Sequence, residues 1–68
     1  MPHIEISTWF GIDLDDMQAA LDWEAEQSGS RPSQFSHHHL MGMLNSGQSE
    51  RNRITRLIKD WKTATGAS

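Results

Sequence analysis

Three consecutive histidines, His37, His38 and His39, are the residues of this sequence that most invite a chemical role. Imidazole binds metal ions, and its charge changes near pH 6.5, so a metal site and a pH-sensitive interface both come into question. On a helix, however, successive side chains point about 100° apart, and zinc-binding histidines sit four positions apart on one face. The run therefore predicts surface histidines, with a pH-sensitive interface as the alternative, and we expect no bound metal or other cofactor.

Catalytic chemistry finds little support in the residue types. The chain has no Cys, which excludes a thiol nucleophile and a thiolate metal site. It contains no Gly-x-Ser-x-Gly elbow and no Gly-rich loop that would cradle a phosphate. At 68 residues, it has room for one small domain with a thin core. We therefore expect a protein that works by binding and not by catalysis.

Charge is divided unevenly along the chain. Residues 1–29 hold seven acidic side chains and no Lys or Arg, whereas residues 30–68 hold six basic and two acidic side chains. The two parts carry −7 and +4, which gives the net charge of −3. Either the acidic and basic elements pack together and partly neutralise each other, or a charged face meets an oppositely charged partner.

Trp23 is the first candidate for a partner-binding residue. On a helix it lies about 180° from Leu14 and Leu21, which belong to the apolar stripe. Either Trp9 or Phe10 folds across this second face, or the Trp23 ring is exposed. An exposed Trp among acidic side chains has the composition of a protein-binding hot spot. The acidic side chains of this predicted site are Asp16, Asp22 and Glu26.

A basic face is the second candidate surface. It lies opposite the apolar stripe of the last predicted helix and holds Arg53, Arg56 and Lys59, with Arg51 and Lys62 at its flank. Such a face contacts phosphates or an acidic protein, or is simply solvated, with Arg56 and Asp60 as an i,i+4 pair.

These residues are positioned by a mainly α domain of three helices that follows a short N-terminal strand or extended arm. Asp13 is the expected N-cap of the first helix, and Pro32 stands in the first turn of the second. The predicted boundaries are an arm over 1–12, helices over 13–28, 32–45 and 49–63, and a frayed tail over 64–68.

Apolar spacing predicts which faces of the helices form the core. The second helix is apolar on several sides, so we expect it to be the most buried element. The first helix contributes Leu14, Met17, Leu21 and Ala25, and the third contributes Ile54, Leu57, Ile58 and Trp61.

The order of elements resembles the ribbon-helix-helix DNA-binding dimers. A strand over His3–Ser7 precedes a helix that ends at Gly29, a Ser-Arg-Pro-Ser link and a second helix from Phe35. In that family, paired strands enter the major groove and their outward side chains read bases. The resemblance implies a dimeric DNA-binding transcriptional regulator, in which His3, Glu5 and Ser7 point outward.

The first twenty residues also resemble the opening of the small tautomerases. The run Met-Pro-His-Ile-Glu-Ile continues through Trp9 and Gly11 to an acidic helix start. Those enzymes use the secondary amine of an N-terminal proline as a base, so the resemblance implies a catalytic role for Pro2.

No apolar run approaches the ~20 residues of a membrane span. The N-terminal residues lack a basic segment followed by an apolar stretch, so we expect no signal peptide. We therefore expect no membrane association and a cytoplasmic protein, in a cell or a host cell. The sequence predicts a small non-enzymatic regulator or inhibitor that occupies a site on a larger protein partner, and a homodimer fits its thin core. The alternative is a DNA-binding dimer, which contacts nucleic acid through the N-terminal arm or the third helix. The third hypothesis is a tautomerase.

Overall fold

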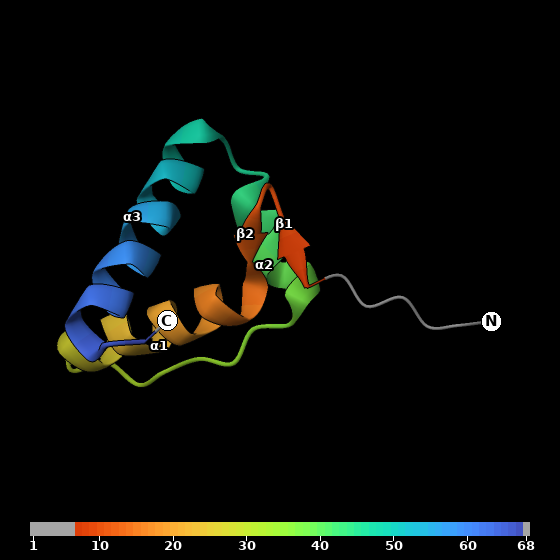
Figure 1. Cartoon of the computed structure of the whole chain (residues 1–68). Helices are drawn as coiled ribbons and strands as arrows, with labels where there is room; N and C mark the ends of the chain where they lie inside the picture. Colours follow the sequence, from red (N-terminus) through yellow and green to blue (C-terminus); the bar gives the residue numbers. More distant parts are fainter. Residues whose placement is uncertain (1–6, 68) are drawn as a thin grey trace.

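The computed structural model describes residues 7–67, which begin with a short hairpin and continue in three helices (Figure 1). The hairpin consists of β1 (Thr8–Trp9) and β2 (Ile12–Asp13). The helices are α1 (Leu14–Gln27), α2 (His37–Leu44) and α3 (Gln48–Thr65). This architecture confirms the predicted mainly α class with three helices and a short strand segment ahead of them.

The hairpin reverses direction through two residues with positive φ. Its strands are antiparallel, with Trp9 opposite Ile12. Between them, Phe10 and Gly11 have φ of 53° and 72°. A type I′ turn requires this sign at both of its central positions, and its twist suits a two-residue connection.

The predicted extended arm over 1–12 is therefore corrected within the described residues. The chain turns back at Phe10 instead of running on in one direction. The backbone N–H of Leu14 then donates to the carbonyl of Ser7 at 2.9 Å, which ties the start of α1 to the residue ahead of β1. Residues 1–6, which include the predicted strand from His3 and the proposed catalytic Pro2, lie outside the described part.

Asp13 caps the N-terminus of α1. Its Oδ1 accepts hydrogen bonds from the backbone N–H groups of Asp15 (2.8 Å) and Asp16 (3.1 Å). These are two of the donors that a helix start leaves without an intrahelical partner. After the helix, Gly29 has φ of 72°, a conformation common where helices end. The predicted helix over 13–28 corresponds to α1 together with its two capping residues.

The second helix starts later than predicted. Helix α2 begins at His37, not at residue 32, and Ser36 is its N-cap. The Ser36 Oγ accepts a hydrogen bond from the backbone N–H of His39 at 3.2 Å. Pro32 was interpreted as a first-turn residue, but it stands in the irregular segment 28–36.

The segment 28–36 stays irregular because α1 binds its backbone. Gln18 donates from Nε2 to the carbonyl of Ser33 and accepts at Oε1 from the N–H of Phe35, at 2.8 and 2.9 Å. Backbone groups that bond to a side chain of α1 cannot at the same time close a helical turn. The segment therefore crosses α1 in an extended course before α2 starts.

Helix α3 is longer than predicted at its C-terminal end. It continues to Thr65 and ends at Gly66, which has φ of 72°. The predicted frayed tail over 64–68 therefore begins with two helical residues, and the Thr65 hydroxyl donates to the Trp61 carbonyl at 2.7 Å.

The core lies where the three helices meet. Helices α1 and α3 pack across each other at a wide angle, and α2 lies beside the hairpin (Figure 1). The large side chains that are fully buried are Leu14, Met17, Leu40, Leu44 and Ile54. Ala20 is buried as well, and Leu57 is buried with 8% of its surface exposed.

Two predictions about the core are corrected. Helix α2 is not buried on several sides, because Met41 and Met43 are only half-buried and Gly42 is exposed. In α1, the predicted stripe is covered over its first half only. Leu21 and Ala25, which continue the stripe, are half-buried.

Candidate interaction surfaces

Phe10 stands out at the tip of the hairpin. It is 55% exposed and is the large hydrophobic residue that the described part of the chain leaves to solvent. It also has φ of 53° without being a glycine. Such a conformation is an outlier for a bulky side chain and calls for an explanation.

The Phe10 ring is held in place from two sides. The guanidinium carbon of Arg51 lies 4.3 Å from its centroid. The Trp9 ring meets it edge-on, with centroids 5.7 Å apart and an interplanar angle of 86°. Trp9 is itself fixed, since its Nε1 donates to Asn45 Oδ1 at 3.1 Å.

Arg51 is equally fixed by the α2–α3 connection. Its Nη1 donates to the carbonyl of Leu44 at 2.9 Å, and its Nη2 donates to Gln48 Oε1 at 3.3 Å. The contacts that hold the hairpin tip therefore come from residues 44–51, beside which the tip lies (Figure 1). We call Phe10 and Arg51 the anchor.

A Phe at position 10 contributes little to the stability of the fold. A left-handed conformation costs a residue with a Cβ roughly 1–2 kcal/mol. A cation above an exposed ring returns about 0.5–1 kcal/mol, and an aromatic pair about 0.5–1.5 kcal/mol. These contributions roughly cancel, and Gly or Asn makes the same turn without the strain. Phe10, the aromatic residue of the anchor, is thus a side chain that is held in place and presented to solvent.

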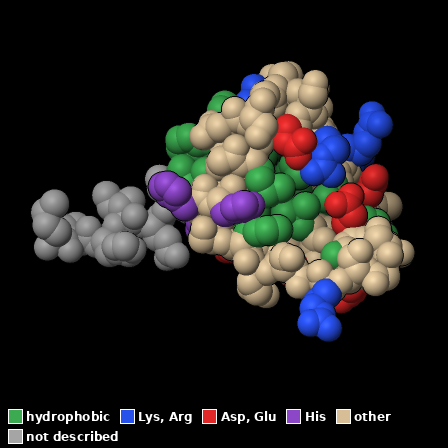
Figure 2. All heavy atoms as spheres, turned by 180° about the vertical axis from the view of Figure 1, so that it is seen from behind, with side chains coloured by type: hydrophobic (Ala, Val, Ile, Leu, Met, Phe, Trp, Pro, Cys, Tyr) green, Lys and Arg blue, Asp and Glu red, His purple; other side chains and the backbone are tan. Residues whose placement is uncertain are grey.

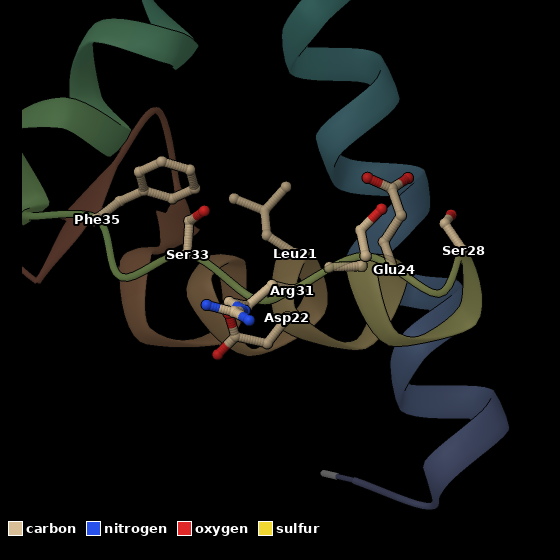
Figure 3. Close-up of a pocket in the computed structure, with 9 residues that line it drawn as sticks. Leu21, Asp22, Glu24, Ser28, Arg31, Ser33 and Phe35 are labelled. Carbon is tan, nitrogen blue, oxygen red and sulfur yellow. The ribbon is translucent and has the colours of Figure 1, made fainter.

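A cleft of about 360 Å³ lies along the C-terminal half of α1 (Figure 3). Its apolar lining comes from Leu21 and Ala25 of α1 and from Phe35 of the segment 28–36. Figure 3 shows Phe35 at one end of this cleft and Glu24 at the other. The cleft exists because the apolar stripe of α1 extends past the part that α2 and α3 cover.

The polar lining of the cleft carries two carboxylates and one guanidinium, those of Asp22, Glu24 and Arg31. Asp22 Oδ1 accepts from Gln18 Nε2 at 2.8 Å. Glu24 Oε2 lies 3.7 Å from Arg53 Nη1, a long contact between partly exposed side chains. Both carboxylates therefore keep acceptor capacity toward the cleft.

Arg53 is bound more closely by its own helix than by α1. Its Nη2 lies 2.7 Å from Glu50 Oε1. This hydrogen bond lowers the pKa of Glu50 below its ordinary value of 4.5 and raises the pKa of Arg53.

Apolar side chains gather on the face that holds the cleft, between histidines on one side and a region of mixed charge on the other (Figure 2). The imidazole of His39 stacks on Phe35, with centroids 4.7 Å apart and an interplanar angle of 7°. His37 Nε2 lies 3.1 Å from Asp15 Oδ1. Among residues 7–67, no group of three His, Cys, Asp or Glu side chains is arranged to hold a metal ion.

The residues of the predicted acidic site have different surroundings in the structure. Trp23 is half-buried and lies outside the core cluster, while Trp9 and Phe10 contact each other. Asp16 pairs with Lys62 at 3.1 Å, and Asp22 lines the cleft. Glu26 is exposed.

The cations of the predicted basic face also have different surroundings. Lys62 pairs with Asp16 of α1, and Arg53 pairs with Glu50 and, more distantly, with Glu24. Arg56 and Lys59 are exposed, and neither forms an ion pair with another described residue. The acidic and basic elements thus partly neutralise each other across α1 and α3, while two cations stay available.

The sequence contained a signal for the anchor that its interpretation missed. Trp9 and Ile12 flank a two-residue gap with Gly11 in its second position. That spacing is typical of a hairpin turn with positive φ at both central residues, which would have placed Phe10 at its tip.

Comparison of the chain with protein-family models, with curated proteins and with solved structures found no match. Within residues 7–67, no helix combines the length and the apolar character that crossing a membrane requires.

Proposed function

We propose that this chain is a non-enzymatic protein-binding regulator or inhibitor, which acts in the cytoplasm by inserting Phe10 into an apolar site on a larger partner. The observation that carries this proposal is the exposed Phe10 ring, held in a strained conformation by Arg51 and Trp9. A side chain that is already immobilised loses little conformational freedom on binding, so more of its contact energy contributes to affinity.

The chemistry around the ring also favours protein recognition. Aromatic residues and arginine are enriched at the centres of protein interfaces, where a few buried side chains dominate the binding energy. The anchor combines one of each. Trp23, the hot spot proposed from sequence, has less surface to offer because it is half-buried.

A dimeric DNA-binding regulator is supported less well. Non-specific affinity for nucleic acid grows with the number of phosphates that Lys and Arg neutralise. Of the five cations in and beside the proposed basic face, Arg53 and Lys62 take part in ion pairs and Arg51 donates to Leu44 and Gln48. Arg56 and Lys59 remain. A surface with two available cations fits a modest contribution to protein association better than a phosphate-binding face.

Photo-crosslinking at position 10 tests the proposal. The chain is expressed in its source cell with benzoylphenylalanine in place of Phe10 or, as a control, of the exposed Thr63 on α3. We expect a discrete cross-linked product with a larger protein from position 10 and none from position 63. Added wild-type chain should suppress this product, and the Phe10→Asn variant should not.

Two results would contradict the proposal. One is a set of products that does not differ between positions 10 and 63. The other is equal competition by the wild-type chain and by Phe10→Asn, since a partner that binds the ring must distinguish them.

A further inference from the structure

We infer that the anchor of one copy docks into the α1 cleft of a second copy, so that the chain self-associates and withholds Phe10 from other partners. This inference rests on the proposed function, because the same ring serves both contacts. It adds that Phe10 of a second copy occupies the cleft, and that this contact limits how much Phe10 is available to other partners.

The two surfaces match in polarity and size. The ring of Phe10 is the exposed large apolar group of the described chain, and Leu21, Ala25 and Phe35 give the cleft an apolar lining. The cleft measures about 360 Å³. An apolar cavity of roughly 150 Å³ is enough to hold benzene in a protein, so the benzyl group has room together with part of its neighbours.

The charges beside the two surfaces are opposite. Arg51 covers one face of the Phe10 ring, and it has more donors than the two that bind Leu44 and Gln48. The cleft presents the carboxylates of Asp22 and Glu24 and the guanidinium of Arg31, so its charged side chains sum to −1 (two negative and one positive). An aromatic ring that enters the cleft therefore brings a guanidinium toward two acceptors, and hydrogen bonds of this charge-assisted kind are the stronger ones.

One chain cannot satisfy both surfaces by itself. The hairpin tip is fixed to residues 44–51. The cleft lies between the C-terminal half of α1 and the segment 28–36, and Figure 1 shows the C-terminal end of α1 far from the hairpin tip. The contact must therefore join different surfaces of two copies. Such a heterologous contact leaves one anchor and one cleft free on each pair, so it continues into chains or closes into rings.

Complementation between two variants tests this geometry. Phe10→Asn removes the anchor and keeps the cleft, whereas Ala25→Arg fills the cleft and keeps the anchor. In sedimentation velocity at tens to hundreds of micromolar, we expect the wild-type mass to rise above 7.7 kDa with concentration. Each variant alone should self-associate at least tenfold more weakly than the wild type and stay monomeric over this concentration range. An equimolar mixture of the two variants should form a pair and nothing larger.

Two further variants serve as controls. Ala19→Arg places the same side chain on α1 at another half-buried alanine that does not line the cleft, so it should associate like the wild type. Asp22→Lys replaces a carboxylate of the cleft by a cation and should weaken association as Ala25→Arg does. It keeps the test valid if circular dichroism shows that Ala25→Arg does not fold.

Three results would overturn the inference: a wild-type chain that is monomeric at every concentration, a variant mixture that stays monomeric, or Phe10→Asn that associates like the wild type. The last would mean that two clefts face each other. None of these results decides the proposed function, because the cross-link from position 10 to a larger protein is measured separately.

Discussion

The two halves of α1 both carry apolar side chains on the same helical face, three or four positions apart, but lie in different surroundings. In the first half, Leu14 and Met17 are fully buried against α2 and α3. In the second half, Leu21 packs at the edge of the core, and Leu21 and Ala25 line a cleft that the irregular segment 28–36 borders. Helical periodicity therefore identifies which face of α1 is apolar, whereas the length and course of the neighbouring elements decide how much of that face is covered.

The largest expected difference lies between the two halves themselves. Met17→Ala removes a fully buried side chain and should lower the free energy of unfolding by about 2–5 kcal/mol. Leu21→Ala removes a half-buried one and should cost about 1–2 kcal/mol, since less apolar surface returns to water. Denaturant unfolding of both variants measures this, and equal losses would show that the second half is covered as well as the first.

Trp23 sharpens the comparison, because it lies in the second half of α1 but off the apolar stripe. It is half-buried, so Trp23→Ala should cost about 1–2 kcal/mol, below the roughly 3–5 kcal/mol of a buried Trp. Thermal melting gives the value. If the melting temperature stays unchanged while partner binding weakens, the hot spot lies at Trp23 and not at Phe10.

Substitution of Phe10 in the anchor should change the free energy of unfolding far less than substitution in the core. Phe10→Asn gives up two ring contacts but relieves a left-handed conformation that Asn tolerates, so stability should change by less than about 1 kcal/mol. Chemical unfolding beside wild type measures it. A loss above about 2 kcal/mol would make Phe10 a structural residue and would remove the main support for the proposed function.

The smallest effect concerns the ion pair that adjoins the second half of α1. Because Arg53 lowers the pKa of Glu50, the pair contributes stability above pH 4.5, and that stability is lost as the pH falls through the lower folded-state pKa. Glu50→Gln should therefore lower stability at pH 7 by less than about 1 kcal/mol and by nothing at pH 2. Melting curves at the two pH values provide the test, and an equal loss at both would assign the effect to packing.

Much of the fold could be predicted because its signals are local. The three helices follow from apolar spacing, and the start of α1 follows from Asp13, whose side chain can accept two hydrogen bonds from the first turn. The start of α2 could not be found in the same way. Pro32 and Ser36 are both good residues for a helix start, and the choice depends on bonds to Gln18 that lie far apart in sequence.

The candidate surfaces were harder to predict, since both depend on tertiary packing. The exposure of Phe10 follows from a hairpin register, and its rigidity follows from Arg51, 41 positions further along the chain. Composition alone pointed to Trp23 and to two charged faces. It could not show that Asp16 and Lys62, one from each face, lie 3.1 Å apart.

The side chain of Gln18 makes two hydrogen bonds to the backbone of the segment 28–36 that a neighbouring strand would otherwise make. A primary amide carries a donor and an acceptor side by side, as a peptide group does. Through that amide, α1 satisfies the carbonyl of Ser33 and the N–H of Phe35 as a paired strand would. Substitution of this one polar residue should therefore remove both hydrogen bonds between α1 and the segment 28–36 without altering any residue of the buried core.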